Sequence, residues 1–208
     1  MGDRNEHYFS GQPTSDSQPL DYVFDGPAGP ITVTSDSGVF SHGRLDKATA
    51  LLIRSPQVAA LLPGTGDLVD LGCGAGPIAL WLAALRPHCT VWAVDTNERA
   101  LALTATNALR NNLTNIRAVR PEDVPEDLRP AALVSNPPVR VGKDVLHGMI
   151  RLWMDRLADG AVAVLVVGRH LGADSLQAWM SAEGWPTERI GSSGGFRLLV
   201  ARVRSAAG

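Results

Sequence analysis

The segment from Asp67 to Leu85 constrains the fold of this chain most strongly. A short apolar run, Leu68–Leu71, leads directly into the loop Gly72-Cys73-Gly74-Ala75-Gly76. Pro77–Leu85 is then apolar at helical spacing, with proline in the first turn, where helices accept it. A buried strand that passes through a glycine-rich turn into a helix is the first half of a βαβ unit. The segment therefore predicts a parallel sheet covered by helices.

The rest of the chain continues this alternation of strands and helices. Further strands are expected at 90–94, 116–119, 131–134, 161–167 and 196–203, and further helices at 46–53, 98–113, 144–157 and 175–182. The run at 161–167 has no polar interruption, which is typical of a central strand buried on both faces. Two β-prone runs, 22–24 and 31–34, flank a Gly/Pro turn and predict a hairpin. The expected fold class is α/β, a doubly wound Rossmann-like sheet with an N-terminal β-hairpin extension.

Length and composition favour one structural domain. The chain has 208 residues, 45% of them hydrophobic, and no apolar run reaches the roughly 18–20 residues of a membrane span. We expect residues 1–55 to form an arm, hairpin and first helix packed on the core, and 56–208 to form the main domain. The polar start lacks the apolar segment of a secretion signal, and the cysteines form no CxxC pair. These features predict a cytoplasmic protein without a disulfide framework, membrane segment or metal site.

The charge balance limits the kinds of partner. A net charge of −2 argues against a generally basic nucleic-acid-binding surface, but a local basic patch stays open. Only Lys47 and Lys143 are lysines, and the other basic residues are arginines. Arginine suits phosphate groups and guanine edges, although genomic base composition produces the same bias.

The glycine loop and Asp95 together indicate a nucleoside site. The glycines follow a GxGxG spacing, and Pro77 stands where a dinucleotide site has its third glycine. Asp95 ends the next strand, 23 positions after Gly72. A carboxylate there can accept hydrogen bonds from both ribose hydroxyls of a nucleoside. A plain glycine turn followed by a helix-capping acid is the alternative interpretation.

The string Asn136-Pro137-Pro138 follows the strand at 131–134. Two prolines fix the backbone and remove two N–H donors, so the Asn136 amide oxygen and the Pro137 carbonyl are free to accept from an incoming NH₂ group. These acceptors would turn the nitrogen lone pair toward an electrophilic methyl group, which is catalysis by positioning. Aspartate at 136 would keep the acceptor, so we expect it to be tolerated. A simple strand-ending turn is the alternative.

These strings together resemble a known family. Val69–Pro77, Ala93–Asp95 and Asn136–Pro138 are similar to the motifs of class I S-adenosylmethionine-dependent methyltransferases. The resemblance is closest to the "small" methyltransferase domain of the ribosomal RNA guanine-N2 methyltransferase C group, and it extends to the strings His7–Ser10, Ser35–Ser41, Asn136–Lys143 and Gly195–Leu198. It implies a seven-stranded sheet whose last strand is antiparallel, and S-adenosyl-L-methionine as the cofactor.

The resemblance also implies roles for individual residues. The glycine loop would wrap the methionine part of the cofactor, Asp95 would hold the ribose, and Phe40 with the 46–49 stretch would close the methionine side. The expected cofactor site comprises Phe40, Thr49, Asp70, Gly72, Cys73, Gly74, Gly76, Asp95, Thr96, Asp123 and Asn136. For the adenine amine, Glu122 and Asp123 are the candidates. The expected catalytic residues are Asn136, Pro137 and Pro138, and the expected substrate contacts are Val139, Arg140 and Lys143, with Arg151 a further candidate for phosphate contact.

The implied function is guanine-N2 methylation of 16S ribosomal RNA, with the RNA or the small ribosomal subunit as partner, by a monomer or a homodimer. One alternative keeps the chemistry and changes the acceptor to a protein glutamine or a small-molecule amine. A second is a non-catalytic cofactor-binding protein, because many enzymes with this motif carry an aromatic base-stacking residue where this chain has Val139. Pro77 and the Asn-Pro-Pro string argue against an oxidoreductase.

Overall fold

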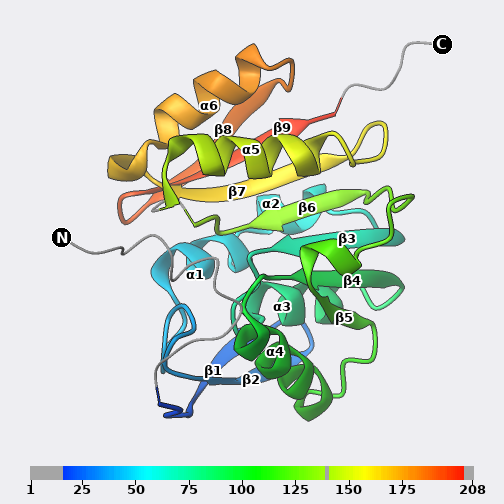
Figure 1. Cartoon of the computed structure of the whole chain (residues 1–208), viewed down its shortest axis with the longest axis vertical. Coiled ribbons are helices and arrows are strands. Elements are labelled where there is room, and N and C mark those ends of the chain that lie inside the picture. Colours follow the sequence, from blue (N-terminus) through cyan, green and yellow to red (C-terminus); the bar gives the residue numbers. More distant parts are fainter. Residues whose placement is uncertain (1–15, 139–140, 204–208) are drawn as a thin grey trace.

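The computed structural model describes residues 16–138 and 141–203, and Figure 1 shows how its helices and strands are arranged. In chain order the elements are β1 (Leu20–Gly26), β2 (Gly29–Ser35), α1 (Lys47–Ile53), α2 (Pro56–Leu61), β3 (Gly66–Leu71), α3 (Pro77–Leu85), β4 (Cys89–Val94), α4 (Glu98–Arg110), β5 (Ile116–Val119), η2 (Pro121–Asp123), β6 (Ala132–Ser135), α5 (Lys143–Met154), β7 (Val162–Gly168), η4 (Arg169–Leu171), α6 (Ala173–Ala182), β8 (Thr187–Ser193) and β9 (Phe196–Arg202).

Seven strands form one sheet in the order β5-β4-β3-β6-β7-β9-β8. The pairs from β5 to β7 are parallel, whereas β9, the last strand of the chain, is antiparallel to both of its neighbours. The doubly wound, seven-stranded α/β sheet is therefore confirmed. The strand order reverses at β3, since β4 follows on one side and β6 lies on the other. Ligands of such sheets bind at the carboxyl ends of the strands beside this switch point.

Helices cover both faces of the sheet (Figure 1). One apolar cluster joins the hairpin and helices α1 to α4 to side chains such as Leu68 and Val164, and the other joins α5 and α6 to side chains such as Val69 and Leu165. All seven residues of β7 are buried, because this strand is covered on both sides. This confirms the central strand that the unbroken apolar run predicts.

The hairpin of β1 and β2 forms its own two-stranded sheet, and α4 meets the free edge of β2. Asn111 accepts from Thr32 N at 3.0 Å and donates to Thr32 O at 2.7 Å. One helical turn earlier, Asn107 makes the same pair of bonds to Thr34, both at 2.9 Å. A side-chain amide carries a donor and an acceptor, as a peptide group does, so the two asparagines take the place of a neighbouring strand.

Two elements differ from the sequence prediction. Helix α2, which the sequence pattern does not predict, begins at Pro56 directly after the expected helix at 46–53; Ser55 caps α2 and the proline occupies its first turn. Strand β8 was missed because it is a largely exposed edge strand with the polar sequence TERIGSS, which shows no apolar alternation. The string His7–Ser10 lies outside the described residues. Within the described part of the chain, no helix is long and apolar enough to cross a membrane.

Candidate active site

A pocket open to solvent lies at the carboxyl ends of β3 and β6. The glycine loop forms one wall, α1 and the segment before it form another, and β1 contributes a side chain. The lining residues are Tyr22, Phe40, Ser41, Asp46, Thr49, Gly72, Cys73, Gly74, Ala75, Pro77, Ile78 and Asn136. The structure thus brings together the glycine loop, the start of α1 and the Asn-Pro-Pro string, which are far apart in the sequence.

The loop between β3 and α3 curls over the end of β4. Its first N–H, from Gly72, donates to Val94 O at 2.8 Å. Gly72, Gly74 and Gly76 all have positive φ, between 57° and 87°, a backbone region that mainly glycine adopts. Space is also short at Gly76, where a Cβ would stand 2.7 Å from Thr104 Oγ1. Backbone shape and packing therefore both require glycine in this loop.

The carboxylate of Asp95 holds the glycine loop in place by accepting hydrogen bonds from backbone N–H groups. Its Oδ2 accepts from Gly74 N and its Oδ1 accepts from Asn97 N, both at 2.9 Å. Burial raises the pKa of this carboxyl, and the backbone bonds from Asn97, Gly74 and Thr96 oppose that rise. The side chain is only half-buried, and three backbone bonds leave part of the acceptor capacity of its two oxygens unused. The remaining capacity can accept from a ribose hydroxyl, and Thr96 lies directly beside Asp95.

Asp70 braces the loop from behind. Its side chain is fully buried, its Oδ2 accepts from Ala79 N in α3 at 2.9 Å, and its Oδ1 has no described partner. Burial raises the pKa of Asp70 to about 8, and the nearby charge of Asp95 adds to this. A side chain without exposed surface cannot touch a ligand in this conformation. The expectation that Asp70 contacts the cofactor is therefore replaced by a supporting position behind the loop.

Cys73 contributes its backbone to the pocket, while its thiol packs inward. The sulfur lies 3.7 Å from Thr104 Oγ1 and 3.7 Å from Gly74 O. Burial, with the charges of Asp95 and Asp70, raises the pKa of this thiol well above its ordinary value. A buried neutral thiol is a packing group and not a nucleophile.

The acidic residues after β5 lie outside the pocket lining. Glu122 pairs with Arg120, and a hydrogen bond from its own backbone N–H, together with this pairing, holds the pKa of Glu122 below its ordinary value. Asp123 is exposed on the same short 3₁₀ helix, and the structure gives its side chain no bond to a described residue. Asp123 therefore stays the prediction for the adenine partner.

Phe40 stands over the glycine loop on an anchored segment. Its ring is 64% exposed, unusual for so large an apolar side chain. Two residues that begin α4 hold the segment, because Asn97 Nδ2 donates to Gly38 O at 3.0 Å and Arg99 Nη1 donates to Ser37 O at 2.8 Å. The segment that carries Phe40 is thereby tied to the residue two positions after Asp95. An exposed ring over a polar loop is suited to covering a bound molecule.

The geometry of Asn136 fixes which end of its amide is free. Nδ2 donates to Asp46 Oδ2 and to Thr49 Oγ1, both at 3.1 Å. A carboxylate only accepts, so the NH₂ group must face Asp46, and the carbonyl oxygen is left without a described donor. Asp46 also caps α1, which sets the position of that helix. Ser135 donates to Leu71 O at 2.6 Å and joins the ends of β6 and β3.

The two prolines pack against the same loop. Pro137 is buried, and Pro138 Cδ would lie 3.9 Å from a Cβ at Gly72. Pro138 O accepts from Val141 N at 3.1 Å, so the chain turns away after the motif. The Asn-Pro-Pro string therefore reaches the glycine loop, as its place in the sheet order predicts.

The expected substrate contacts are described only in part. Val139 and Arg140 lie outside the described residues. Lys143 is exposed at the start of α5. Arg151 lies two turns further along that helix and pairs with Glu183 at 2.8 Å, so the structure gives it a partner other than phosphate. Among the described residues, no group of His, Cys, Asp or Glu side chains has the arrangement of a metal site.

Six lining residues are not among the individual site residues expected from the sequence, although one of them, Asp46, belongs to the 46–49 stretch expected at the methionine side: Tyr22, Ser41, Asp46, Ala75, Pro77 and Ile78. Tyr22 comes from the hairpin, and its burial raises its pKa above the ordinary value, with Asp46 adding to the rise. Its contribution depends on how the hairpin docks, which local sequence does not specify. Asp46 carried a readable signal, because an aspartate before an apolar helical run is a common N-cap.

Comparison with known proteins agrees with this geometry. Residues 30–199 match the family described as the methyltransferase small domain. The chain is 34% identical over 177 residues to the uncharacterized protein YbxB of Bacillus subtilis, covering 82% of this chain and 85% of that protein. It is 34% identical over 180 residues to ribosomal RNA small subunit methyltransferase C of Ectopseudomonas mendocina, covering 84% of this chain and 52% of that protein. The chain thus spans about half the length of the latter relative.

A solved structure shares the fold. The 16S rRNA N2 G1207 methyltransferase of T. thermophilus, solved in complex with AdoMet and guanosine, superposes with a TM-score of 0.78 at 24% identity. The match covers 92% of this chain and 52% of that one. At this identity the likeness concerns the fold.

Proposed function

Because the chain belongs to the methyltransferase small domain family, we propose that it transfers a methyl group from S-adenosylmethionine to the exocyclic N2 amine of guanine in 16S ribosomal RNA. The cofactor, when bound, supplies an electrophilic methyl group on sulfur. Everything else in the reaction is positioning, which this chain's own residues perform.

The residues present fit the cofactor. The glycines of the loop carry no side chains, so a ligand can come close to the backbone there. Asp95 has acceptor capacity for a ribose, and the exposed ring of Phe40 can cover a bound cofactor. Thr49 and Asp46 line the opposite wall. We assign the methionine part to the side of the pocket between the glycine loop and α1, and the ribose to Asp95.

The observation that carries the proposal is the fixed amide of Asn136. Its NH₂ group is held by Asp46 and Thr49, so its carbonyl oxygen is left as an acceptor at the pocket. The Pro137 carbonyl follows immediately on a backbone that two prolines restrict. Two adjacent acceptors to which no described residue donates suit an NH₂ group, which brings two N–H bonds.

The chemistry follows from those acceptors. An exocyclic amine on an aromatic ring is a poor nucleophile, because its lone pair is delocalised into the ring. Hydrogen bonds to Asn136 and to the Pro137 carbonyl favour the pyramidal nitrogen of the transition state and strengthen as positive charge develops there. The proton then leaves the positively charged nitrogen for solvent, so no strong base is needed at the pocket.

Ribosomal RNA is the acceptor that the relatives favour, since several of them are named ribosomal RNA small subunit methyltransferase C. The proposed partner is accordingly the RNA itself or the small ribosomal subunit. A protein glutamine also presents a planar NH₂ group, and so do some small molecules. These acceptors are outcomes that the experiments below distinguish.

The test is substitution of Asn136. Asn136→Ala removes one acceptor and should lower turnover by about 10²–10³-fold, judging from losses of single preorganised hydrogen bonds, while cofactor affinity changes little. Thr49→Val is the matched control, because it loosens the amide without removing it and should cost less. Near wild-type turnover by folded Asn136→Ala would exclude the amine-orienting role.

The variant Asn136→Asp keeps the shape of the side chain and replaces the neutral amide with a carboxylate. On sequence grounds we expected it to be tolerated, but the Asp46 carboxylate lies 3.1 Å from the nitrogen it would replace. Two carboxylates at that distance repel each other. Asn136→Asp should therefore be impaired near neutral pH, and partial recovery as the pH falls would support this geometry.

A further inference from the structure

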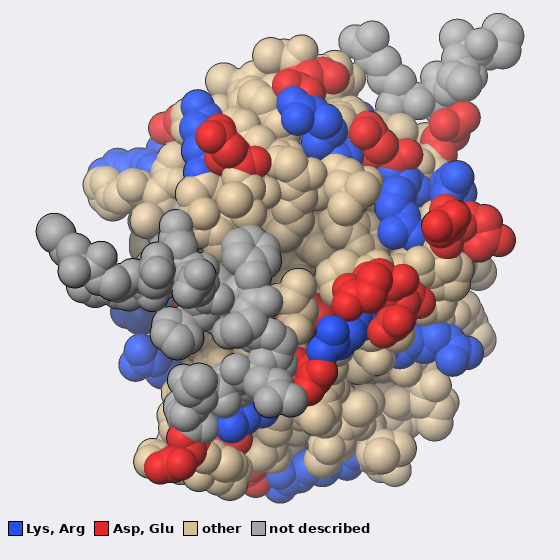
Figure 2. Space-filling view, viewed as in Figure 1, with Lys and Arg blue, Asp and Glu red and all other residues tan. Residues whose placement is uncertain are grey.

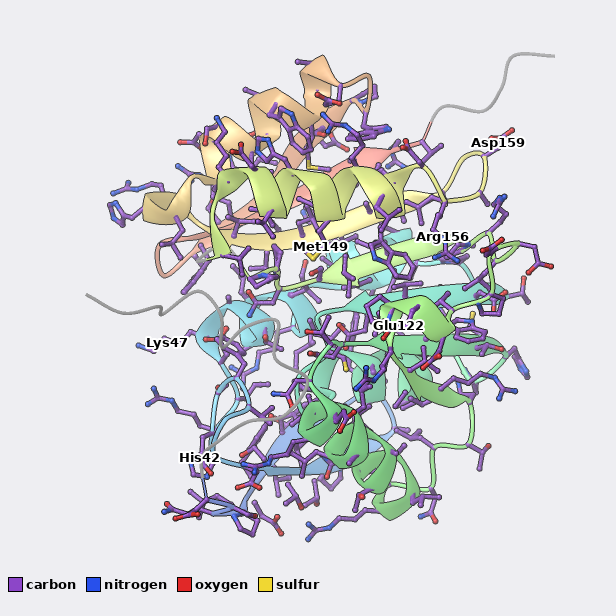
Figure 3. The ribbon with its side chains drawn as sticks, in the orientation of Figure 1. His42, Lys47, Glu122, Met149, Arg156 and Asp159 are labelled. Atoms are coloured by element: carbon purple, nitrogen blue, oxygen red, sulfur yellow. The ribbon has the colours of Figure 1, made fainter. Side chains whose placement is uncertain are left out.

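The charged residues differ along the carboxyl edge of the sheet. Over β4 and β5, where we assign the nucleoside, acidic residues stand together with arginines, and Arg120 there is paired with Glu98 and Glu122. On the other side of Asn136, the ends of α1 and β7 carry Arg44, Lys47 and Arg169. In Figure 2 a group of carboxylates stands near the middle of the face, and Lys and Arg side chains project at its left margin. Figure 3 labels Lys47 at that margin and Glu122 on the far side of the view's centre.

The three cations on the basic side have no carboxylate partner among the described residues. Arg44, Lys47 and Arg169 are all exposed, and the only side-chain contact given is Arg169 Nη2 at 3.4 Å from His170 Nε2. Some arginines elsewhere in the described residues are ion-paired: Arg110 with Asp21 at 2.7 Å, Arg151 with Glu183 at 2.8 Å and Arg197 with Asp174 at 3.0 Å. The chain as a whole has a net charge of −2, so three cations without a carboxylate partner on this side of the site give it a locally basic character.

Arg44 and Lys47 are next to lining residues of the pocket. Arg44 is bonded through its backbone to Ser41, a lining residue, at 2.8 Å. Lys47 follows Asp46, the lining residue that holds Asn136. Asp46 itself is engaged by the N–H groups of Ala48 and Thr49 at 2.8 and 3.1 Å, so it is not paired with Lys47.

Arg169 lies farther along the strand direction than Asn136, which lines the pocket. Ser135 is level with Leu165 across the sheet, so β7 continues beyond the end of β6. Arg169 lies three residues past the level of Asn136, which at the rise of a strand is about 10 Å. The three cations are thus exposed, two beside the pocket lining and one beyond the level of Asn136.

We propose that Arg44, Lys47 and Arg169 form a phosphate-binding rim for a single-stranded RNA segment that flanks the methylated base. This inference rests on the proposed function. An enzyme that modifies a base inside RNA must take that base out of its stack. A base that reaches down to Asn136 leaves its sugar and the adjoining phosphates at the border of the pocket, where only exposed cations can meet them. Such contacts position the strand without reading its sequence.

The release of counterions from the RNA determines how much the rim should change RNA affinity. Each phosphate neutralised on a single strand contributes about 0.7 to the slope of log affinity against log salt. Three contacts therefore contribute a slope of about 2. Over the tenfold salt range from 1 M down to 0.1 M, this slope gives about a 100-fold difference in RNA affinity at 0.1 M salt. The difference should shrink as salt rises.

The experiment compares two triple variants with the same change of charge. Arg44→Gln/Lys47→Gln/Arg169→Gln removes the rim. Arg54→Gln/Arg189→Gln/Arg202→Gln is the matched control, since these three arginines are also exposed and the structure gives their side chains no ion pair with described residues. For each protein, filter binding measures affinity for naked small-subunit ribosomal RNA over a range of salt, calorimetry measures cofactor affinity, and methyl transfer gives KM and kcat.

The rim variant should bind RNA about 100-fold more weakly at 0.1 M salt, with a slope lower by about 2. Its KM for RNA should rise, while kcat at saturating RNA and cofactor affinity stay near wild type. Wild-type affinity and slope in the rim variant, or an equal loss in the control, would overturn the rim. Rim-dependent RNA binding without methyl transfer would instead refute the acceptor and leave the rim standing, so the two failures are distinguishable.

Discussion

Asn107 is expected to couple the hairpin to the cofactor loop, and its removal should affect both stability and cofactor binding. The side chain is fully buried and makes three hydrogen bonds at 2.9 Å. Two join it to the backbone N–H and C=O of Thr34 in β2, and the third donates to Ala75 O in the glycine loop. The side-chain amide of Asn107 therefore holds both β2, which pairs with the strand that carries Tyr22, and the glycine loop.

The magnitude follows from what Asn107→Ala leaves behind. Ala75 O becomes a buried acceptor without a donor, which costs about 1–3 kcal/mol. The two Thr34 groups are only partly buried, so water can replace some of what they lose. We expect a total destabilisation of about 3 kcal/mol, which for a chain of this size lowers Tm by about 6–12 °C.

The control is Asn111→Ala, one helical turn along α4. Asn111 makes the same pair of bonds to Thr32 but none to the glycine loop, and it is only half-buried. Urea unfolding and calorimetric titration with S-adenosylhomocysteine measure stability and affinity. Asn107→Ala should weaken both, whereas Asn111→Ala should cost less stability and leave affinity near wild type. Equal effects of the two variants on affinity would refute the coupling through Ala75.

Three further predictions concern the cofactor side. Asp95→Ala should weaken cofactor binding by about 1.5–3 kcal/mol, the range for hydrogen bonds to a charged group, and calorimetry with unchanged affinity would remove Asp95 from the site. Phe40→Ala should leave stability within about 0.5 kcal/mol because the ring is exposed, yet weaken cofactor affinity; a loss of stability instead would show that the ring packs. Asp70 has a folded-state pKa of about 8, above its ordinary value of 3.8, so its stabilising contribution is complete below about pH 4 and is lost as pH rises through 8. Relative to Asp70→Asn, the wild type should therefore lose up to about 1.4 kcal/mol of stability per pH unit between pH 5 and 7, and parallel pH profiles in urea would contradict the buried acid.

The parts of the fold that local patterns specify could be predicted. Apolar runs of strand length alternate with helical spacing, so the strands at 68–71 and 161–167 and the helix after Gly76 were readable from the sequence. β8 was not, because none of its residues is buried, so no buried face requires apolar alternation along this edge strand. The break between α1 and α2 was ambiguous, since proline both ends one helix and begins the next.

The site residues likewise include some that the sequence could predict and some that it could not. Gly72, Asp95 and Asn136 follow strands of a parallel sheet, and topology alone brings such positions to one edge. Tyr22 could not be foreseen, because it reaches the pocket only through the docking of the hairpin on α4. Nor could the inward position of Asp70, since the residues at the end of a strand alternate between the two faces and their exposure depends on what covers them.

The central claim is that the fixed amide of Asn136 presents an exocyclic guanine amine for methylation. The most direct measurement is transfer of labelled methyl from S-adenosylmethionine to intact small ribosomal subunits, naked ribosomal RNA and total protein, run side by side, followed by analysis of digested nucleosides. We expect labelled N2-methylguanosine from small-subunit RNA with the wild type and about 10²–10³-fold less with Asn136→Ala. Label in protein glutamine alone, or no transfer to any acceptor by a protein that binds the cofactor, would contradict it.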